Sequence, residues 1–144
     1  MKLRIPPRIL GATLLLAAAL PVRAVDSMEV VVENVRSTEG RILVEVLASP
    51  EAFAGDTAPL ERLDLAAQAP ATRFTLDLAP GTYALRILHD LDGDYAMSTN
   101  LVGMPAEPWA FSNNAAGRFG PPGWEAARFE VGAEPVSQTL QLVQ

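Results

Sequence analysis

The sequence predicts an all-β protein: a single antiparallel β-sandwich of about seven strands, of immunoglobulin-like or transthyretin-like type. Short runs rich in β-branched residues alternate apolar and polar positions, turn residues separate them, and helical periodicity is almost absent. The spacing is regular except for one long loop, which follows the strand ending at His89.

The first 24 residues have the layout of a secretory signal peptide. Three basic residues precede an apolar run from Ile9 to Leu20, and small residues surround Ala24. The run is shorter than the roughly 20 residues that a membrane-spanning helix needs. We therefore expect cleavage after Ala24, a periplasmic or secreted location, and one β-sandwich domain over residues 25–144. An uncleaved N-terminal anchor is the alternative.

Charge and cysteine content limit the partners of the expected mature chain. Residues 25–144 hold seven arginines, no lysine and seventeen acidic residues, a formal charge of about −10. Nucleic acid and anionic lipid surfaces are therefore unfavourable partners. The chain has no cysteine, so its stability must come from its core or from a bound ion. No second apolar stretch is long enough to span a membrane, and we expect no span after cleavage.

The first half of the domain predicts a hairpin and a short helix. Residues 27–35 and 41–48 are strand-like, and Gly40 between them favours a β-hairpin. "SPEAF" (49–53) offers Ser as an N-cap and Pro at the first helical position, which predicts one or two helical turns. Residues 55–70 are ambiguous between a strand and a helical turn.

The remaining strands are indicated by clean alternation. Residues 72–78 and 82–89 form two strands around the turn residues 79–81, and two more strands follow at 127–131 and 136–143.

The segment 89–124 interrupts this pattern. It holds five glycines, four prolines, three asparagines and five of the nine aromatic residues. A structureless loop of this length is uncommon and usually functional.

Three motifs in and around this segment resemble a known family. They are "PGTYALRILHD", "LVGMPAEPWAFSNN" and "FGPPGWEAARF", within residues 80–129. They resemble the exported bacterial proteins grouped as domain of unknown function 2141, which implies an immunoglobulin-like or transthyretin-like sandwich but no activity. The family loop has the form Asp-x-Asn-x-Asn-Gly-x-x-Asp. Here Asp92 and Asp94 replace the asparagines, Tyr95 the glycine and Ser98 the last aspartate, which weakens any ion site implied by the resemblance.

Independently of the resemblance, the loop presents oxygen ligands at alternate positions, as calcium loops do. The candidate calcium ligands are Asp90, Asp92, Asp94, the Ala96 carbonyl and Ser98. The twelfth position, where a bidentate acid is wanted, is Leu101, and Asn100 or Glu107 would have to replace it. The alternative is an Asx-turn loop whose aspartates cap backbone N–H groups.

His89 shares a strand face with apolar residues, so we expect it to be buried and hydrogen-bonded to loop backbone. Side chains of adjacent strand residues point to opposite faces, so Asp90 is badly placed to orient His89 for catalysis. One histidine and no cysteine also disfavour zinc.

Aromatic and amide side chains of the same segment form a candidate ligand-binding platform. Its members are Tyr95, Trp109, Asn113, Asn114 and Trp124. The alternative is that the rings close one end of the sandwich, with Phe111 and Phe119 as core anchors and the two tryptophans partly exposed. In the same reading the asparagines form Asx turns, and Glu107 is a candidate ion-pair partner of Arg118.

These features favour a non-catalytic binding or accessory module of the bacterial envelope, with a carbohydrate, peptide or protein ligand and a calcium-stabilised loop. The alternatives are a small carboxylate-based hydrolase and a purely structural envelope protein.

Overall fold

The computed structural model describes residues 27–144, and the expected leader, residues 1–24, lies outside them. The described chain is all-β, with eight strands in two sheets and a few short helices. The elements, in chain order, are β1 (Ser27–Glu33), β2 (Arg41–Leu47), α1 (Pro50–Ala54), β3 (Glu61–Ala66), β4 (Ala71–Asp77), β5 (Gly81–Asp90), β6 (Trp109–Phe111), the 3-10 helix η1 (Ser112–Asn114), α2 (Trp124–Ala127), β7 (Phe129–Val131) and β8 (Ser137–Gln141). None of the helices in residues 27–144 combines the length and apolar character needed to cross a membrane.

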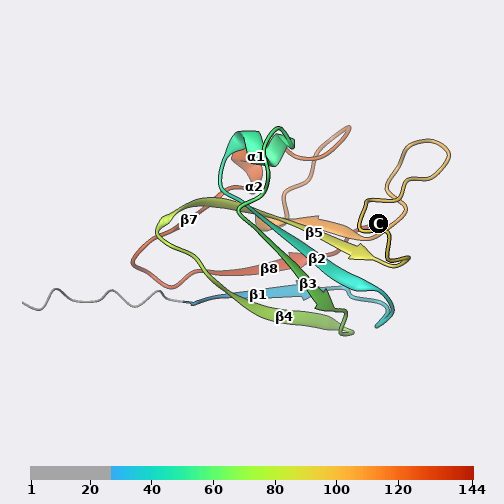
Figure 1. Ribbon diagram of the computed structural model, residues 1–144, viewed down its shortest axis with the longest axis horizontal. Coiled ribbons are helices and arrows are strands. Elements are labelled where there is room, and N and C mark those ends of the chain that lie inside the picture. Colours follow the sequence, from blue (N-terminus) through green and yellow to red (C-terminus); the bar gives the residue numbers. More distant parts are fainter. Residues whose placement is uncertain (1–26) are drawn as a thin grey trace, which may run out of the picture.

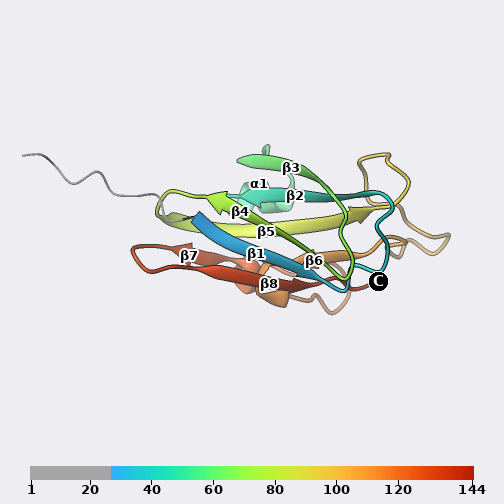
Figure 2. The ribbon, with the colours of Figure 1, turned by 90° about the horizontal axis from the view of Figure 1, so that it is seen from below.

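The strands form two layers with one apolar core between them. One sheet has the order β4-β1-β8, the other has the order β3-β2-β5-β6, and β7 pairs with the start of β5. Figure 2 shows β2 and β3 in a layer above β1 and β8. Alternate side chains of both sheets are buried in the core: Met28, Val30, Val32, Leu76 and Leu140 from the first, and Ile42, Val44, Val46, Leu85 and Ile87 from the second. The alternation in the sequence thus identified the faces that meet in the core.

The predicted hairpin of the first two strands is wrong. β1 pairs with β4 and β8, whereas β2 pairs with β3 and β5, so the two strands belong to different sheets. Val35, in the connection between them, is buried in the core and donates its N–H to the Pro70 carbonyl at 3.1 Å. Because both strands bury an apolar face in one core, alternation by itself does not distinguish pairing within a sheet from packing across the core.

The expectation of a wholly antiparallel fold is also corrected, because β1 and β8 run parallel. Parallel neighbours need a long connection, and here nearly the whole described chain lies between the two strands. The strand count is eight, since residues 61–66, left ambiguous by the sequence, form β3, and residues 109–111, expected in the long loop, form β6.

The predicted short helix α1 is confirmed. The Ser49 hydroxyl accepts a hydrogen bond from the Ala52 N–H at 3.2 Å, Pro50 occupies the first turn, and Gly55 ends the helix in the left-handed conformation. α1 buries Phe53 against the outer face of the second sheet, and α2 lies beside it (Figure 1).

The segment 89–124 is not one structureless loop. β6 adds to the edge of β5, and η1 follows it directly. The Ser112 hydroxyl of η1 accepts the Leu85 N–H at 2.8 Å and donates to the Ala127 carbonyl at 2.6 Å, which ties the segment to β5 and α2. The irregular parts are therefore residues 91–108 and 115–123.

Candidate functional site

The end of β5 brings the chain to a tightly packed corner. A Cβ added to Gly40 would lie 2.0 Å from the Asp90 carbonyl oxygen, so only glycine allows the β1–β2 connection to approach this closely. The His89 side chain is fully buried on the core side, and its Nε2 lies 2.8 Å from the Glu39 carbonyl. The predicted buried histidine bonded to backbone is confirmed, and Asp90 points to the opposite face.

The imidazole has one unusual feature. A carbonyl oxygen can only accept, so Nε2 carries the proton in this hydrogen bond. His89 Nδ1 is buried without a hydrogen-bond partner among residues 27–144. A proton on Nε2 therefore fits this environment, whereas an N–H at Nδ1 would be buried without an acceptor.

The Asp90 carboxylate organises the first turn of the loop. It is fully buried, and it accepts the N–H of Gly93 at 2.8 Å with Oδ1 and that of Tyr95 at 3.0 Å with Oδ2. Gly93 (φ 78°) and Tyr95 (φ 61°) both adopt the left-handed conformation. Tyr95 adopts this conformation although it is less favourable for a residue with a side chain than for glycine.

Glu107 closes the base of the loop from its far end. Its carboxylate is 4% exposed and accepts the Leu91 N–H at 2.7 Å with Oε1 and the Ser98 N–H at 3.1 Å with Oε2. One side chain therefore binds two points of the loop that lie seven residues apart, and it holds both against the end of β5.

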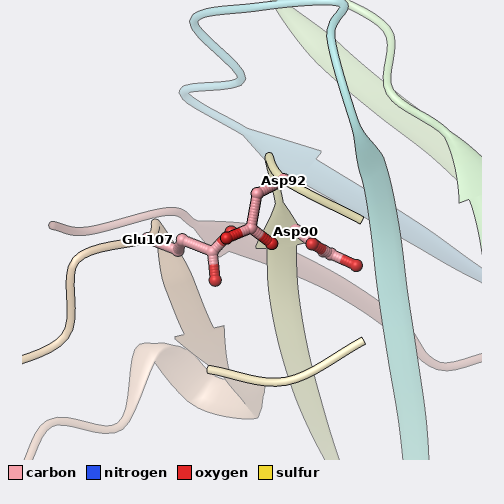
Figure 3. A group of neighbouring side chains, drawn as sticks. All are labelled: Asp90, Asp92 and Glu107. Atoms are coloured by element: carbon pink, nitrogen blue, oxygen red, sulfur yellow. The ribbon is translucent and has the colours of Figure 1, made fainter. Parts of the chain in front are cut away.

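The carboxylates of Asp90, Asp92 and Glu107 converge, with oxygen atoms within 4.8 Å of one another. Figure 3 shows the three groups at the end of β5, where the Asp92 carboxylate lies between the other two in this view. We call these residues the acid triad. Glu107, one of the two residues expected to replace Leu101 as a ligand, thus lies beside Asp90 and Asp92.

The triad has no counter-charge in the described chain. None of the ion pairs in residues 27–144 includes a member of the triad. Two of its carboxylates are nearly fully buried, and buried charges in proteins are normally paired or bound to a metal. The triad has unused lone pairs, because each oxygen of the Asp90 and Glu107 carboxylates accepts only one hydrogen bond within residues 27–144.

The other predicted ligands divide into two groups. Ser98 is adjacent to the triad, because its hydroxyl donates to Asp92 Oδ2 at 3.3 Å. Asp94 is not a member of the triad, and its carboxylate caps the Ala96 N–H at 2.8 Å in an Asx turn. Asp92 similarly accepts the Asp94 N–H at 3.2 Å. The Asx-turn alternative is therefore confirmed for Asp92 and Asp94, whose carboxylates accept backbone N–H groups two residues on. Of the three aspartates, only Asp90 and Asp92 belong to the triad.

The Tyr95 side chain has a partner outside the triad. Its ring is exposed, and its hydroxyl donates to Asp64 of β3 at 3.3 Å. Asp64 also accepts a hydrogen bond from Arg41 of β2, and this bond raises the pKa of the Arg41 guanidinium above its ordinary value. Tyr95 therefore links the loop to the outer edge of the second sheet.

The candidate ligand residues Asn113 and Asn114 use their amides within the protein. Asn113 Nδ2 donates to the Arg128 carbonyl at 2.8 Å, and its Oδ1 accepts from Gln138 at 3.1 Å. Asn114 Oδ1 accepts the Gln141 N–H at 2.7 Å. Both residues have positive φ, as the sequence predicted, but their side-chain oxygens accept from Gln138 and Gln141 and not from the backbone two residues on, so the predicted Asx turns are wrong. They join η1 to β8 and to the α2–β7 junction, and the structure does not bring them to Tyr95 as one platform.

Trp109 and Trp124 flank a cluster of aromatic rings. Trp109 contacts Phe111 edge-on at 5.6 Å, Phe53 lies 5.5 Å from Phe111, and Trp124 meets Phe53 edge-on at 6.0 Å. Both tryptophans are partly exposed, as expected. Arg86 extends over Phe53 and Phe111, with its guanidinium carbon 5.7 and 5.9 Å from the ring centroids.

A cleft of about 440 Å³ opens beside these rings. It is lined by α1, the 121–123 segment, Trp124, Arg86 and Phe111. No sequence pattern selected Arg86 or Phe53 for this cleft. Their only signals were a charged residue in the middle of a mostly apolar strand and a phenylalanine in a very short helix.

The two phenylalanines of the segment differ. Phe111 is buried as predicted, but Phe119 is 97% exposed, so its assignment as a core anchor is wrong. The neighbouring Arg118 lies over the Phe119 ring at 5.9 Å and does not pair with Glu107. Phe119 sits in a turn of the 115–123 segment that projects beyond the sheets, where its apolar character could not be satisfied by the core.

Comparison with known proteins identifies a family and no individual relative. The family described as an uncharacterized protein conserved in bacteria, domain of unknown function 2141, matches residues 30–139, which include every strand from β2 to β7 and the whole triad. No curated protein and no solved structure matches the chain. Since the match covers well over half of the sequence, the chain belongs to the domain of unknown function 2141 family.

Proposed function

We propose that this protein is a non-catalytic binding or accessory module of the bacterial envelope, whose long loop is stabilised by calcium at the acid triad. The observation that carries the proposal is the convergence of Asp90, Asp92 and Glu107 within 4.8 Å, without a counter-charge in residues 27–144. Close carboxylates repel one another unless a cation or a proton intervenes. A divalent cation would relieve this repulsion at both ends of the loop at once.

Calcium suits the donor set better than zinc. It takes six to eight oxygen ligands in flexible geometry, including carboxylates, carbonyls and water. The triad supplies three carboxylates, the Ser98 hydroxyl lies beside Asp92, and water can complete the shell. Zinc prefers nitrogen and sulfur ligands, and the buried His89 is already bonded to Glu39.

The non-catalytic assignment is supported by the burial of the acids. A retaining glycosidase needs two carboxylates about 5–5.5 Å apart that both reach the substrate. Asp90 and Glu107 are close enough, but they are 0% and 4% exposed and each caps two backbone N–H groups. These bonds give the acids a structural task and leave only Asp92 open to solvent. The hydrolase alternative therefore has less support than the calcium-bound loop.

The cleft beside Trp124 is the best candidate surface for a carbohydrate or peptide ligand. It combines apolar rings with one cation, Arg86, which contacts Glu45 and the Phe53 carbonyl but retains further N–H donors. A screen of glycans and peptides, repeated on Trp124→Ala, tests this surface. Trp109→Ala is the matched control because Trp109 does not line the cleft.

The calcium site is tested by thermal unfolding in millimolar calcium and in a chelator. A ligand that binds only the folded state stabilises it by about 2.7 kcal/mol at a concentration 100 times its dissociation constant. We expect Asp92→Asn to remove most of this shift. Asp94→Asn is the matched control: it removes an equal charge from the same exposed turn, but from outside the triad. Identical melting curves in calcium and chelator would contradict the proposal.

We further propose that the two sheets form a single immunoglobulin-like or transthyretin-like sandwich, and that the protein is exported after cleavage behind Ala24. The shared core of the two sheets supports the first statement, and the layout of residues 1–24 supports the second. N-terminal sequencing of protein recovered from the periplasm tests the cleavage site.

A further inference from the structure

The tip of the loop is as apolar as its base is acidic. Residues 98–106, which we call the finger, project from the end of β5 beside the C-terminus (Figure 1). At its tip, Leu101 is fully exposed, Val102 is 81% exposed and Met104 is 60% exposed. Large aliphatic side chains grouped at one exposed point are unusual on a protein surface and mark interaction sites.

The finger is an ordered hairpin. Thr99 and Pro105 form an antiparallel bridge, and the Ala106 N–H donates to the Ser98 carbonyl at 2.8 Å. Asn100 organises the turn: its N–H donates to the Met104 carbonyl at 2.8 Å, and its carbonyl accepts from Gly103 at 2.9 Å. The apolar tip is therefore presented in a defined conformation.

The backbone N–H groups at the tip are almost all satisfied within the finger. The Asn100 side-chain oxygen accepts the N–H groups of Val102 and Met104, both at 3.0 Å. With the bonds of Asn100 and Gly103, four of the five N–H groups in residues 100–104 have a partner, and Pro105 has none to offer. This is the condition that an apolar environment imposes, because unpaired backbone groups are costly there.

We propose that the finger docks this protein at a zwitterionic lipid bilayer by inserting Leu101, Val102 and Met104 into the interface. No charged residue interrupts the twelve positions between Asp94 and Glu107. The tip is convex, apolar and internally hydrogen-bonded. Its insertion between the headgroups and acyl chains therefore buries no charge and few unpaired N–H groups.

The negative charge of the protein limits which lipids it can bind. The acids Asp92 and Asp94 lie in the same loop, and residues 25–144 carry a formal charge of about −10. Repulsion therefore disfavours anionic lipids. The same charge disfavours docking into a second copy of this chain, because two copies would repel each other. A partner that adds a strand to the finger would need free backbone groups, and the tip has few.

The experiment measures flotation with phosphatidylcholine vesicles, with and without added phosphatidylglycerol. We expect binding to phosphatidylcholine, weaker binding as the anionic fraction rises, and at least a tenfold loss in Leu101→Asp, since burying one leucine contributes more than a factor of ten in affinity. Leu60→Asp is the matched control, because Leu60 is 59% exposed and lies before β3. Equal binding by the two variants would overturn the proposal.

A second readout reports insertion directly. The chain has no cysteine, so Leu101→Cys places a single environment-sensitive fluorophore at the tip. We expect a blue shift of its emission on vesicle addition, and no shift for Ala133→Cys in the β7–β8 turn, at the opposite end of the sheets (Figure 1). An unchanged emission at position 101 contradicts insertion. Insertion is also contradicted if Leu101 is needed for self-association or for capture of another protein, and not for lipid binding.

This inference is independent of the calcium proposal, because hydrogen bonds within the protein define the finger. Both readouts are therefore taken in a chelator and again in calcium. Vesicle binding that persists in the chelator supports membrane docking by the finger, whether or not the triad binds calcium. A calcium-dependent melting curve without vesicle binding contradicts membrane docking and leaves the calcium proposal standing.

Discussion

The base and the tip of the 91–108 loop are built in opposite ways. At the base, the buried carboxylates of Asp90 and Glu107 accept four backbone N–H groups. At the tip, Leu101 and Val102 are exposed and contact little of the protein. At the base, the polar groups are buried and hydrogen-bonded. At the tip, the apolar side chains are exposed to solvent.

This difference implies that the base of the loop contributes to the stability of the fold, whereas the tip contributes to interactions with a partner. A buried N–H that loses its acceptor costs the full desolvation penalty, so substitutions at the base should destabilise the fold. An exposed side chain contributes little to the folded state, so substitutions at the tip should leave stability unchanged. We therefore expect the base to hold the tip in place, and the following substitutions test this expectation.

Glu107→Ala should have the largest effect. It leaves the N–H groups of Leu91 and Ser98 without an acceptor, and we expect a loss of about 2–5 kcal/mol in the free energy of unfolding. Urea unfolding followed by tryptophan fluorescence measures this loss. A cost below about 1 kcal/mol would show that water replaces the carboxylate and that the base does not hold the loop.

Asp90→Asn should have a smaller effect, about 1–3 kcal/mol in a chelator. The amide keeps one acceptor oxygen but turns an NH₂ group toward the N–H of either Gly93 or Tyr95. The measurement is again urea unfolding, with Asp94→Asn as the exposed control. An unchanged stability would mean that relief of carboxylate repulsion offsets the lost hydrogen bond, which would itself demonstrate charge strain in the triad.

Asn100→Ala should loosen the tip without unfolding the protein. Two N–H groups lose their acceptor, so the amides of Val102 and Met104 should exchange with solvent about fivefold to tenfold faster. Hydrogen exchange observed by NMR measures this, and the amides of β5 serve as the internal reference. Equal acceleration throughout β5 would mean that tip and base open together.

Leu101→Ser should have the smallest effect on stability, within about 0.5 kcal/mol. Its side chain is fully exposed and so loses no burial on substitution. The same urea titration measures it, and Leu85→Ser, at a fully buried core position, gives the opposite extreme. A loss above 1 kcal/mol for Leu101→Ser would show that the tip packs against the protein in solution.

Local sequence signals predicted much of the fold. The Ser49–Pro50 start of α1, the alternating faces of β4 and β5, and the burial of His89 were all confirmed. Each depends on residues close in sequence, because capping, proline geometry and period-two alternation act over a few positions. The membership of Asp90 and Asp92 in one oxygen cluster also follows from their spacing.

The sequence by itself thus determined the all-β class, the faces that enter the core and the place of the loop. Only the tertiary structure decided that β1 and β2 lie in different sheets, that β8 runs parallel to β1, that Glu107 rather than Asp94 completes the triad, and that Phe119 faces solvent. The physical reason is range. Alternation shows that a residue is to be buried but not which strand it will contact. The triad joins side chains from both ends of a loop, and the path of that loop is set by backbone hydrogen bonds that no local pattern encodes.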